Sequence, residues 1–420
     1  MIKRKAHVEL ITGLDLGSTS VRLAVAKQVF VPGEKTSFQI VGLIEVPSEG
    51  IHKGVITSIE ETVSAVSHSL EKMEQLIGVP IEHAWVGISG LQIISQNSKG
   101  VVAVAKADGE ITAEDLERAI EASRAVATPL NYEILHVIPR AFVVDGQTGI
   151  KDPVGMTGVR LEVDTQIIEG QTSHIKNITK AVYRTGIDID DLVFSVLSVG
   201  DLVTTPRQRD LGAIVVNIGG ATTSLIVYEE GDIIHTAVLP IGGEHVTNDL
   251  AIGLRTSIEV AERVKIECGE CYPGHLNKKE MIDLKMFGAE LNEEVSRKYI
   301  AEIINARMEE ILEKIETELN KIGRSSLLPA GVVFTGGGAK IFGLVDLAKD
   351  KLRLPATLGY PLDILSASEK INDLSFTTAI GLVRWGASMQ AGMGRGGNAG
   401  LKSVEKVSAQ VKGWFKSLIP

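Results

Sequence analysis

A short glycine-containing stretch occurs twice in this chain of 420 residues, and it limits the possible folds more than any other feature. Ile11–Val25 reads ITGLDLGSTSVRLAV and Ala213–Val227 reads AIVVNIGGATTSLIV. Each copy is an apolar strand, one polar residue, a turn of glycine and small residues, and a second apolar strand, which is the pattern of a β-hairpin. The repeat therefore predicts two halves built around equivalent hairpins.

The tips of these hairpins are predicted to bind phosphate. Glycine lets a backbone approach a ligand closely, and successive backbone N–H groups form a concave site for an anion. One glycine-rich hairpin is more often an ordinary turn, but Phe334–Lys340 (FTGGGAK) adds a third glycine-rich turn behind an apolar strand. Two such hairpins from two halves of a chain can hold one polyphosphate between them.

The composition predicts an α/β protein of two or more domains, because 420 residues exceed a single core and 44% are hydrophobic. A formal charge of −10 argues against general nucleic-acid binding. Cys268 and Cys271 form CGEC, which is compatible with redox or zinc chemistry, but without a second pair two reduced thiols are favoured. With no signal peptide and no apolar run of about 20 residues, we expect an intracellular protein that does not span a membrane.

Strands and helices alternate along the chain, which predicts doubly wound sheets. A helix is expected from Ser58 to Leu76, ended by Gly78, and a long one at Glu294–Ile322. Residues 84–163 follow a different pattern, with short strands and turns around one predicted helix. Thr112 and Asp115 are spaced as a capping box at the start of that helix. This block is predicted to be a small inserted subdomain, with the first domain resuming at strand Leu161–Ile168.

The C-terminal residues read as a tether and an amphipathic helix. Gly386–Gly400 is rich in glycine, alanine and serine and predicts a flexible segment. In Leu401–Pro420, apolar residues fall on one helical stripe and lysines on the rest, a pattern that favours binding at an anionic membrane surface over docking on the protein's own core. The residues expected to contact lipid are Val407, Val411, Trp414, Phe415, Leu418, Lys412 and Lys416. Since one short helix binds weakly, many copies in a polymer are expected.

Together these motifs resemble the actin-like ATPase superfamily. The chain is identified as a member of the FtsA family within it, a bacterial family that ties the FtsZ division ring to the cytoplasmic membrane. The resemblance covers nearly the full length and rests on GLDLGSTSVRLAV, VVNIGGATTSLIVYEEG, AERVKIECG, GVVFTGGGAKI, TTAIGLVRWG, the terminal helix and the segment PVGMTGVRLE.

The resemblance implies an α/β, actin-like (ribonuclease H-like) fold of two lobes, with duplicated sheet domains, an inserted α/β subdomain and a C-terminal amphipathic helix. The implied parts are domain IA at 1–83, 164–210 and 376–390, subdomain IC at 84–163, domain IIA at 211–246 and 329–375, subdomain IIB at 247–328, a linker at 391–400 and the helix at 401–420.

The resemblance also implies that ATP and Mg²⁺ bind between the lobes. Asp15 would lie near Mg²⁺, through water; otherwise it caps a turn. Glu262 and Lys265 match an E-x-x-K pair that contacts ribose and adenine in related ATPases; otherwise they are an ordinary ion pair. The full set of expected nucleotide-binding residues is Asp15, Gly17, Ser18, Thr19, Ser20, Asn217, Gly219, Gly220, Ala221, Thr222, Glu262, Lys265, Gly336, Gly337 and Gly338.

Asn217 departs from the family pattern, because the second hairpin usually carries a carboxylate where Asp15 stands in the first. Ser224 likewise stands where an acidic residue is frequent. Phosphoryl transfer depends on positioning and charge compensation. We therefore expect ATP binding with slow or negligible turnover.

The family resemblance supplies the expected partners and location. Asn305 and Arg307 would bind the FtsZ C-terminal peptide, although Arg307 could instead be paired with Glu310. Filaments of the chain itself, lipids of the cytoplasmic membrane and later division proteins are the other partners, at the cytoplasmic face of the division site. The alternatives are a pilus-assembly actin homologue, which ordinarily lacks the terminal helix, and a catalytic actin-fold ATPase or kinase.

Overall fold

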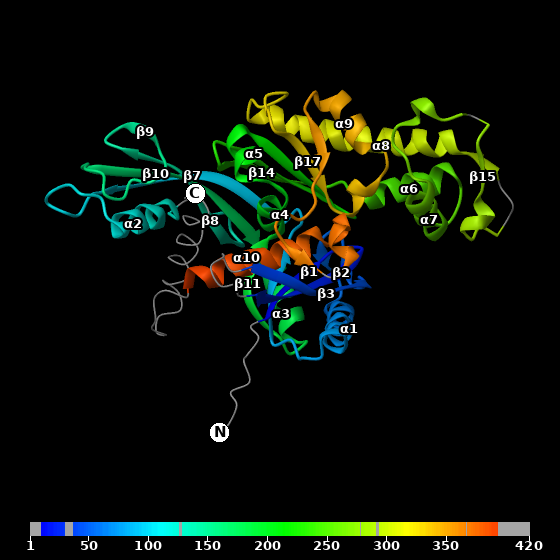
Figure 1. Ribbon diagram of the computed structural model, residues 1–420, viewed down its shortest axis with the longest axis horizontal. Helices are drawn as coiled ribbons and strands as arrows, with labels where there is room; N and C mark the ends of the chain where they lie inside the picture. Colours follow the sequence, from blue (N-terminus) through cyan, green and yellow to red (C-terminus); the bar gives the residue numbers. More distant parts are fainter. Residues whose placement is uncertain are drawn as a thin grey trace, which may run out of the picture.

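The computed structural model describes residues 10–29, 37–125, 128–277, 279–290, 294–366 and 368–393. Two β-sheets form the cores of two lobes, and a third sheet extends from one end of the molecule (Figure 1). The duplicated α/β architecture expected from the repeat is confirmed, since each repeat forms the central hairpin of one lobe's sheet.

The first lobe contains a six-stranded sheet with the order β11-β6-β1-β2-β3-β19. β1 pairs antiparallel with β2, and β2 with β3, whereas β6 and β11 run parallel to β1. The strands are β1 (Leu10–Leu16), β2 (Ser20–Val29), β3 (Ser37–Pro47), β6 (His83–Ile88), β11 (Asp188–Phe194) and β19 (Leu365–Ser366), beside a small hairpin of β4 (Ile51–His52) and β5 (Val55–Ile56).

Helices cover both faces of this sheet. The helices are α1 (Ile59–Ile77), α3 (Thr172–Tyr183), α4 (Ser195–Val203) and α10 (Thr377–Met393), whereas α5 (Pro206–Leu211) packs against the sheet of the second lobe. α1 begins after Ser58, whose side chain accepts from Glu61 N, and ends at left-handed Gly78, as expected. α10 packs against β1, β2 and β6, between this sheet and the second lobe (Figure 1).

The second lobe repeats the strand order of the first. Its five-stranded sheet has the order β14-β13-β12-β17-β18, with an antiparallel β12–β13 hairpin and β17 parallel to β12. The strands are β12 (Ala213–Ile218), β13 (Thr223–Glu229), β14 (Asp232–Leu239), β17 (Gly331–Thr335) and β18 (Ala356–Leu358).

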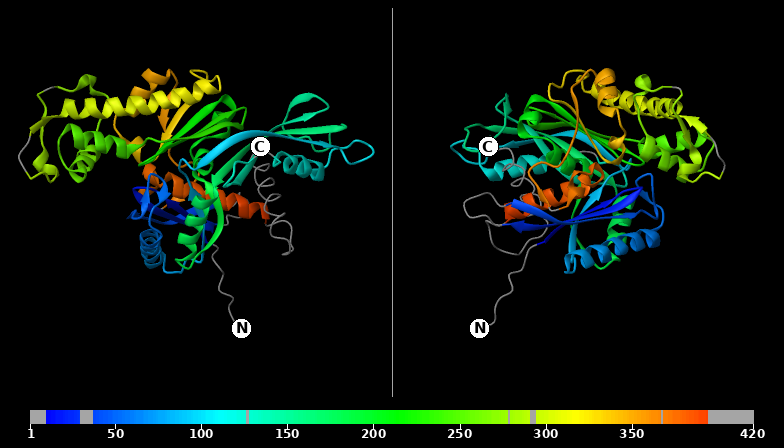
Figure 2. Two further views of the ribbon diagram at one scale, coloured as in Figure 1. Left: turned by 180° about the vertical axis from the view of Figure 1, so that it is seen from behind. Right: turned by 45° about the vertical axis from the view of Figure 1, so that its right-hand side comes forward.

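The helices of the second lobe pack on its sheet and extend beyond it, to the side opposite the third sheet (Figure 2). They are α6 (Gly243–Gly253), α7 (Ile258–Cys268), α8 (Arg297–Lys321) and α9 (Leu344–Leu352), with a short ribbon of β15 (Met281–Asp283) and β16 (Glu294–Ser296). α8 buries an apolar stripe formed by Ile300, Ile304, Met308, Ile311, Leu312, Ile315 and Leu319.

The insert is a four-stranded sheet carrying one helix, α2 (Ala113–Ser123). The strand order is β7-β10-β8-β9, with β7 (Ile93–Ala103), β8 (Tyr132–Val144), β9 (Gln147–Ile150) and β10 (Arg160–Gln171). The capping box predicted at Thr112 and Asp115 is present. The insert has a small core of its own around Ile111, Ile120 and Leu161, so it forms a separate packing unit.

The structure corrects the expected limits of the insert. The strand at 84–88, assigned to the insert, is β6, which pairs with β1 and therefore belongs to the first lobe. Conversely, β10 pairs with β7 and β8 up to Gln171, so the first domain does not resume at residue 164. The sequence pattern placed these two strands in the wrong unit, because apolar strands occur both in the first lobe's sheet and in the insert's sheet. The division of the second lobe into IIA and IIB stays a prediction.

The first residues of the expected tether are helical. α10 continues through Gly386 to Met393, so residues 386–393 are helical rather than a flexible segment. Apart from Ala391–Met393, the linker at 391–400, the helix at 401–420 and the membrane-binding residues predicted in it lie outside the described residues.

Candidate functional site

The two hairpin tips have equivalent backbone geometry. In each tip one glycine lies against the carbonyl oxygen three residues later: a Cβ on Gly17 would be 2.7 Å from Ser20 O, and one on Gly219 would be 2.9 Å from Thr222 O. Since real Cβ contacts are longer, both positions require glycine. Gly219 N also donates to Thr222 O over 2.9 Å and closes the second tip.

The tips face one cavity of about 480 Å³ between the lobes. All fifteen residues expected to bind nucleotide line it, from three glycine-rich loops and one helix. The structure thus brings together groups that are far apart in the sequence, from Asp15 to Gly338.

Asp15 is half-buried at the end of β1, opposite Arg22 on β2. Burial raises the pKa of Asp15 to about 6, while the positive charge of Arg22 acts to lower it. Arg22 itself pairs with Glu45 on β3 over 2.6 Å. No described lysine or arginine forms an ion pair with Asp15, so its carboxylate is free to hold a cation or the water around one.

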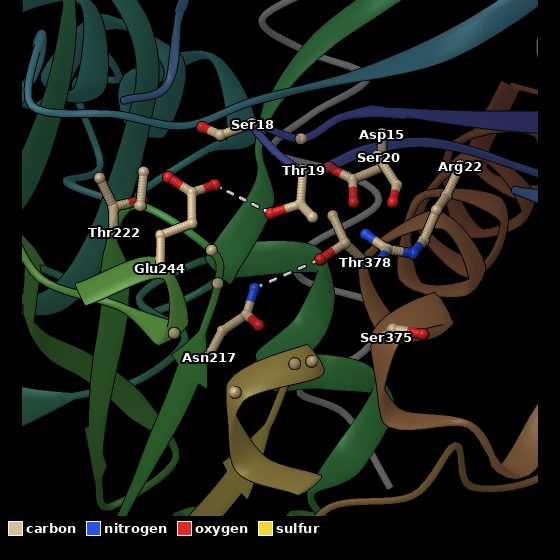
Figure 3. A pocket seen from close by; sticks show the side chains of 18 of the residues that line it. Asp15, Ser18, Thr19, Ser20, Arg22, Asn217, Thr222, Glu244, Ser375 and Thr378 are labelled. Carbon is tan, nitrogen blue, oxygen red and sulfur yellow. Dashed lines mark hydrogen bonds between the residues drawn. The ribbon is translucent and has the colours of Figure 1, made fainter. Parts of the chain in front are cut away.

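Asn217 occupies the equivalent place in the second lobe but is held differently. Its Nδ2 donates to Thr378 Oγ1 over 3.3 Å, which ties it to the start of α10 (Figure 3). Its Oδ1 faces the third loop, since a Cβ on Gly336 would lie 2.3 Å away. The amide therefore joins the second hairpin to α10 by a hydrogen bond and lies directly against the third loop.

The third loop, Gly336–Gly338, enters a 3-10 helix at Gly337–Lys340 that lines the same cavity. Gly336 has φ of 86° and its absent side chain would meet Ile218 O at 2.5 Å, so the backbone of the loop lies directly against the second hairpin.

Glu262 and Lys265 form the predicted pair on α7 and face the cavity. Lys265 Nζ donates to Glu262 Oε2 over 2.6 Å and to Thr247 Oγ1 over 2.8 Å. Thr247 Oγ1 in turn donates to Glu262 Oε2 over 2.5 Å, which joins α6 to α7. Contact of this pair with a ribose or a base stays a prediction.

Several residues that line the cavity were missed by sequence reasoning. Those with polar or charged side chains include Arg22, Glu45, Ser89, Ser195, Glu244, Lys340, Ser375 and Thr378. Glu244 follows a glycine pair at the start of a helix, a signal that could have marked it. Ser375 lies in a 3-10 helix at Leu374–Phe376 and Thr378 in the first turn of α10. The return of the chain to the first lobe at 376–390 was expected, but no local pattern places these two side chains in the cavity.

Asn305 and Arg307 lie outside this cavity, on α8. Asn305 Nδ2 donates to Cys271 O over 2.8 Å. Arg307 makes a forked contact with Asp249 on α6, with Nε 2.5 Å from Oδ2, and also pairs with Glu310. The ion pair considered as the alternative for Arg307 is thus present, and binding of a peptide there stays a prediction.

The two cysteines are free thiols. Burial raises the pKa of Cys271 to about 12, which keeps it protonated and unreactive. Across the part of the chain that the structure describes, no cluster of three or more histidine, cysteine or acidic residues could hold a metal ion. None of the described helices combines the length and apolar character required to cross a bilayer.

Solved structures share this fold at low sequence identity. The type IV pilus biogenesis complex PilM-PilN matches with a TM-score of 0.63 at 17% identity, over 90% of this chain and 98% of that one. MreB5 of Spiroplasma citri bound to ADP matches with a TM-score of 0.53 at 12% identity, over 92% and 99%. These similarities show an actin-like fold.

Comparison with protein families is more specific. Residues 214–381 match the family described as cell division protein FtsA, and residues 90–169 match the SHS2 domain inserted in FtsA. The latter range agrees with the strand pairing, since it starts after β6 and includes most of β10.

Similar proteins of known name extend over almost the whole chain. The cell division protein FtsA of Pseudomonas aeruginosa is 36% identical over 383 residues, which cover 91% of this chain and 90% of that protein. FtsA of Bacillus subtilis is 36% identical over 405 residues, which cover 96% of this chain and 89% of that protein. FtsA of Escherichia coli is 32% identical over 417 residues, which cover 98% of this chain and 96% of that protein. The chain therefore belongs to the FtsA family of cell division proteins.

Proposed function

We propose that this chain is an ATP-binding, actin-like scaffold of cell division. It polymerises on the cytoplasmic membrane at the division site, anchors FtsZ filaments there and recruits later division proteins. The observation that carries nucleotide binding is the pair of equivalent glycine tips, one from each lobe, that face a single cavity. MreB5, a protein of the same fold, has been solved with ADP and with AMPPNP, which supports this assignment.

The residues around the cavity fit a magnesium nucleotide. Backbone N–H groups of the two tips would hold the phosphates, and the hydroxyls of Ser18, Ser20 and Thr222 would add hydrogen bonds. The half-buried carboxylate of Asp15, which lacks an ion pair among the described residues, would hold water of Mg²⁺. Glu262 and Lys265 would contact the sugar or base, and the backbone of the third loop would lie against the adenosine.

ATP turnover is proposed to be slow. At Asn217 the second lobe presents a neutral amide, which can hydrogen-bond but cannot take a proton from an attacking water. A turnover of several ATP per second by the purified protein would contradict this proposal.

Attachment to FtsZ and to the membrane rests on the family and on sequence pattern. The proposed peptide-binding region is subdomain IIB with Asn305 and Arg307, and the proposed membrane element is the helix at 401–420. Weak binding by one such helix becomes stable when filaments present many copies.

The test of nucleotide binding is calorimetry of the full chain with ATP and with adenosine. Gly219→Val places a side chain against Thr222 O and should lower ATP affinity at least about tenfold while changing adenosine affinity little. Equal losses for both ligands, or unchanged ATP affinity, would contradict phosphate binding at the tips.

The test of membrane attachment is co-sedimentation with anionic vesicles, with ATP and an FtsZ tail peptide present. The full chain should pellet with vesicles and carry the peptide with it, and the chain lacking 401–420 should stay in the supernatant. Pelleting of the shortened chain to the same extent would refute the role of the helix.

A further inference from the structure

A carboxylate from the second lobe enters the cavity where the two tips face each other. Glu244 is the second residue of α6, and its side chain points across to Thr19 at the first tip (Figure 3). Thr19 Oγ1 donates to Glu244 Oε1 over 3.0 Å. This hydrogen bond joins the two lobes at the position predicted for the phosphates.

The backbone holds Glu244 firmly against the second tip. Gly243 N donates to Gly219 O and Glu244 N to Gly220 O, each over 2.8 Å. A Cβ on Gly220 would be 2.7 Å from Glu244 Oε1, so the carboxylate lies directly beside the tip. Its place is thus set by the same loop that would hold phosphate.

The charge of Glu244 is not compensated by a basic side chain. Of the other acidic residues that line the cavity, Asp15 likewise has no ion pair among the described residues, whereas Glu45 pairs with Arg22 and Glu262 with Lys265, each over 2.6 Å. Among the described residues, no lysine or arginine pairs with Glu244, whose one hydrogen-bond donor is the neutral hydroxyl of Thr19. Its negative charge therefore faces the space that an anionic polyphosphate would fill.

We propose that Glu244 makes nucleotide binding depend on a divalent cation, an inference that rests on the proposed function. The carboxylate repels a bare polyphosphate, because like charges a few ångströms apart in a partly buried site oppose each other strongly. A cation bound with the nucleotide offsets this repulsion, and Glu244 would hold its water from the second lobe as Asp15 would from the first. Glu244 thus restores, from the next helix, an acidic group that Asn217 does not provide.

The experiment compares ATP affinity in Mg²⁺ and in EDTA for the wild type and Glu244→Gln. The wild type should bind much more tightly in Mg²⁺. Glu244→Gln, which keeps an acceptor for Thr19 but no charge, should bind ATP in EDTA about tenfold more tightly and reduce the ratio of the two affinities by at least about tenfold. Glu244→Asp should retain the ratio to within about threefold.

A matched control is Glu259→Gln, because Glu259 is likewise the second residue of a helix in this lobe but is exposed and does not line the cavity. In Glu259→Gln the ratio of ATP affinity in Mg²⁺ to ATP affinity in EDTA should equal that of the wild type. A wild-type ratio in Glu244→Gln, or an equal change in Glu259→Gln, would overturn the inference while leaving ATP binding intact. If the wild type binds no ATP under either condition, the proposed function fails and this inference with it.

Discussion

Asn217 and Asp15 show how one residue differentiates two otherwise equivalent hairpins. Each stands at the end of the first strand of its hairpin, directly before the turn. Asp15 carries a carboxyl whose pKa is raised to about 6 by burial, whereas Asn217 donates to Thr378 and remains neutral at every pH. The backbone duplication is therefore independent of the chemistry at the two tips.

Replacing Asn217 by aspartate should increase ATP hydrolysis. The Thr378 hydroxyl can donate to a carboxylate as readily as it accepts from the amide, so the position of the side chain is retained. A positioned carboxylate that activates water contributes about 100-fold or more in favourable cases, and even a tenfold rise in phosphate release would be decisive. An unchanged rate with unchanged ATP affinity would show that Asn217 does not limit turnover.

Gly336→Ala should both destabilise the protein and weaken nucleotide binding. The new Cβ would lie 2.3 Å from Asn217 Oδ1 in a left-handed conformation, which costs about 2–4 kcal/mol of unfolding free energy. Gly78→Ala is the control, because its φ is 75° but its surroundings are open, and it should cost about 1 kcal/mol. Urea unfolding measures both, and equal losses would contradict a steric role for the third loop.

At the scale of elements, the insert depends on a buried acidic residue. Asp115 is fully buried and accepts hydrogen bonds from Thr112 N, Ala105 N and the Arg118 side chain. Burial raises the pKa of Asp115, but these hydrogen bonds outweigh it and hold the pKa well below 3.8. One carboxylate thus joins the start of α2 to the end of β7.

Asp115→Ala should lower the unfolding free energy of the insert by about 2–4 kcal/mol, because two backbone N–H groups and one guanidinium lose their acceptor. Amide hydrogen exchange in α2 and β7 measures this, and exchange in the lobe sheets should change little. Since the pKa of Asp115 is lowered from 3.8 in the folded state, its contribution is present above the unfolded pKa and is lost progressively as the pH falls from there toward the lower folded pKa. Uniform loss of protection over all three sheets would argue against an independent insert.

At the scale of the whole molecule, the insert contacts both lobes. Lys151 on its outer hairpin reaches Glu230 O and Asp232 Oδ2 of the second lobe, at 2.8 and 2.5 Å. On the other side, His136 of β8 accepts from Phe194 N of the first lobe over 2.9 Å and its ring meets the edge of Trp385. Movement of one lobe relative to the other would therefore change the contacts that Lys151 and His136 make between the insert and the lobes.

Stability should fall between pH 6.5 and about pH 4 because of His136. Burial lowers the pKa of His136 from 6.5 to about 4, so the unfolded chain takes up a proton in this range before the folded protein does. The loss over the full range is on the order of 3 kcal/mol. His136→Gln keeps an acceptor for Phe194 N and does not titrate, so urea unfolding of this variant should show a smaller decrease from pH 7 to pH 5. Equal decreases in both proteins would refute the assignment.

Local sequence patterns predicted most of the structural parts of the site. The glycine hairpins, the triple-glycine turn and the Glu262–Lys265 spacing each depend on residues adjacent in the chain, because turn geometry and helical spacing are local properties. The family resemblance added that these turns and this pair meet at one nucleotide, and all fifteen residues implied by it line the same cavity. The capping box at Thr112 and the helix end at Gly78 were predictable for the same reason.

By itself the sequence determined the duplicated hairpins, the alternating elements and the capped helix of the insert. Only the tertiary structure decided that β6 joins the first sheet and β10 the insert, that α10 brings Thr378 to Asn217, and that Glu244 meets Thr19 across the cavity. The physical reason is that strand pairing and contacts between lobes join residues far apart in the chain. Which partner each strand or side chain meets depends on how the whole chain packs, and no local pattern contains that information.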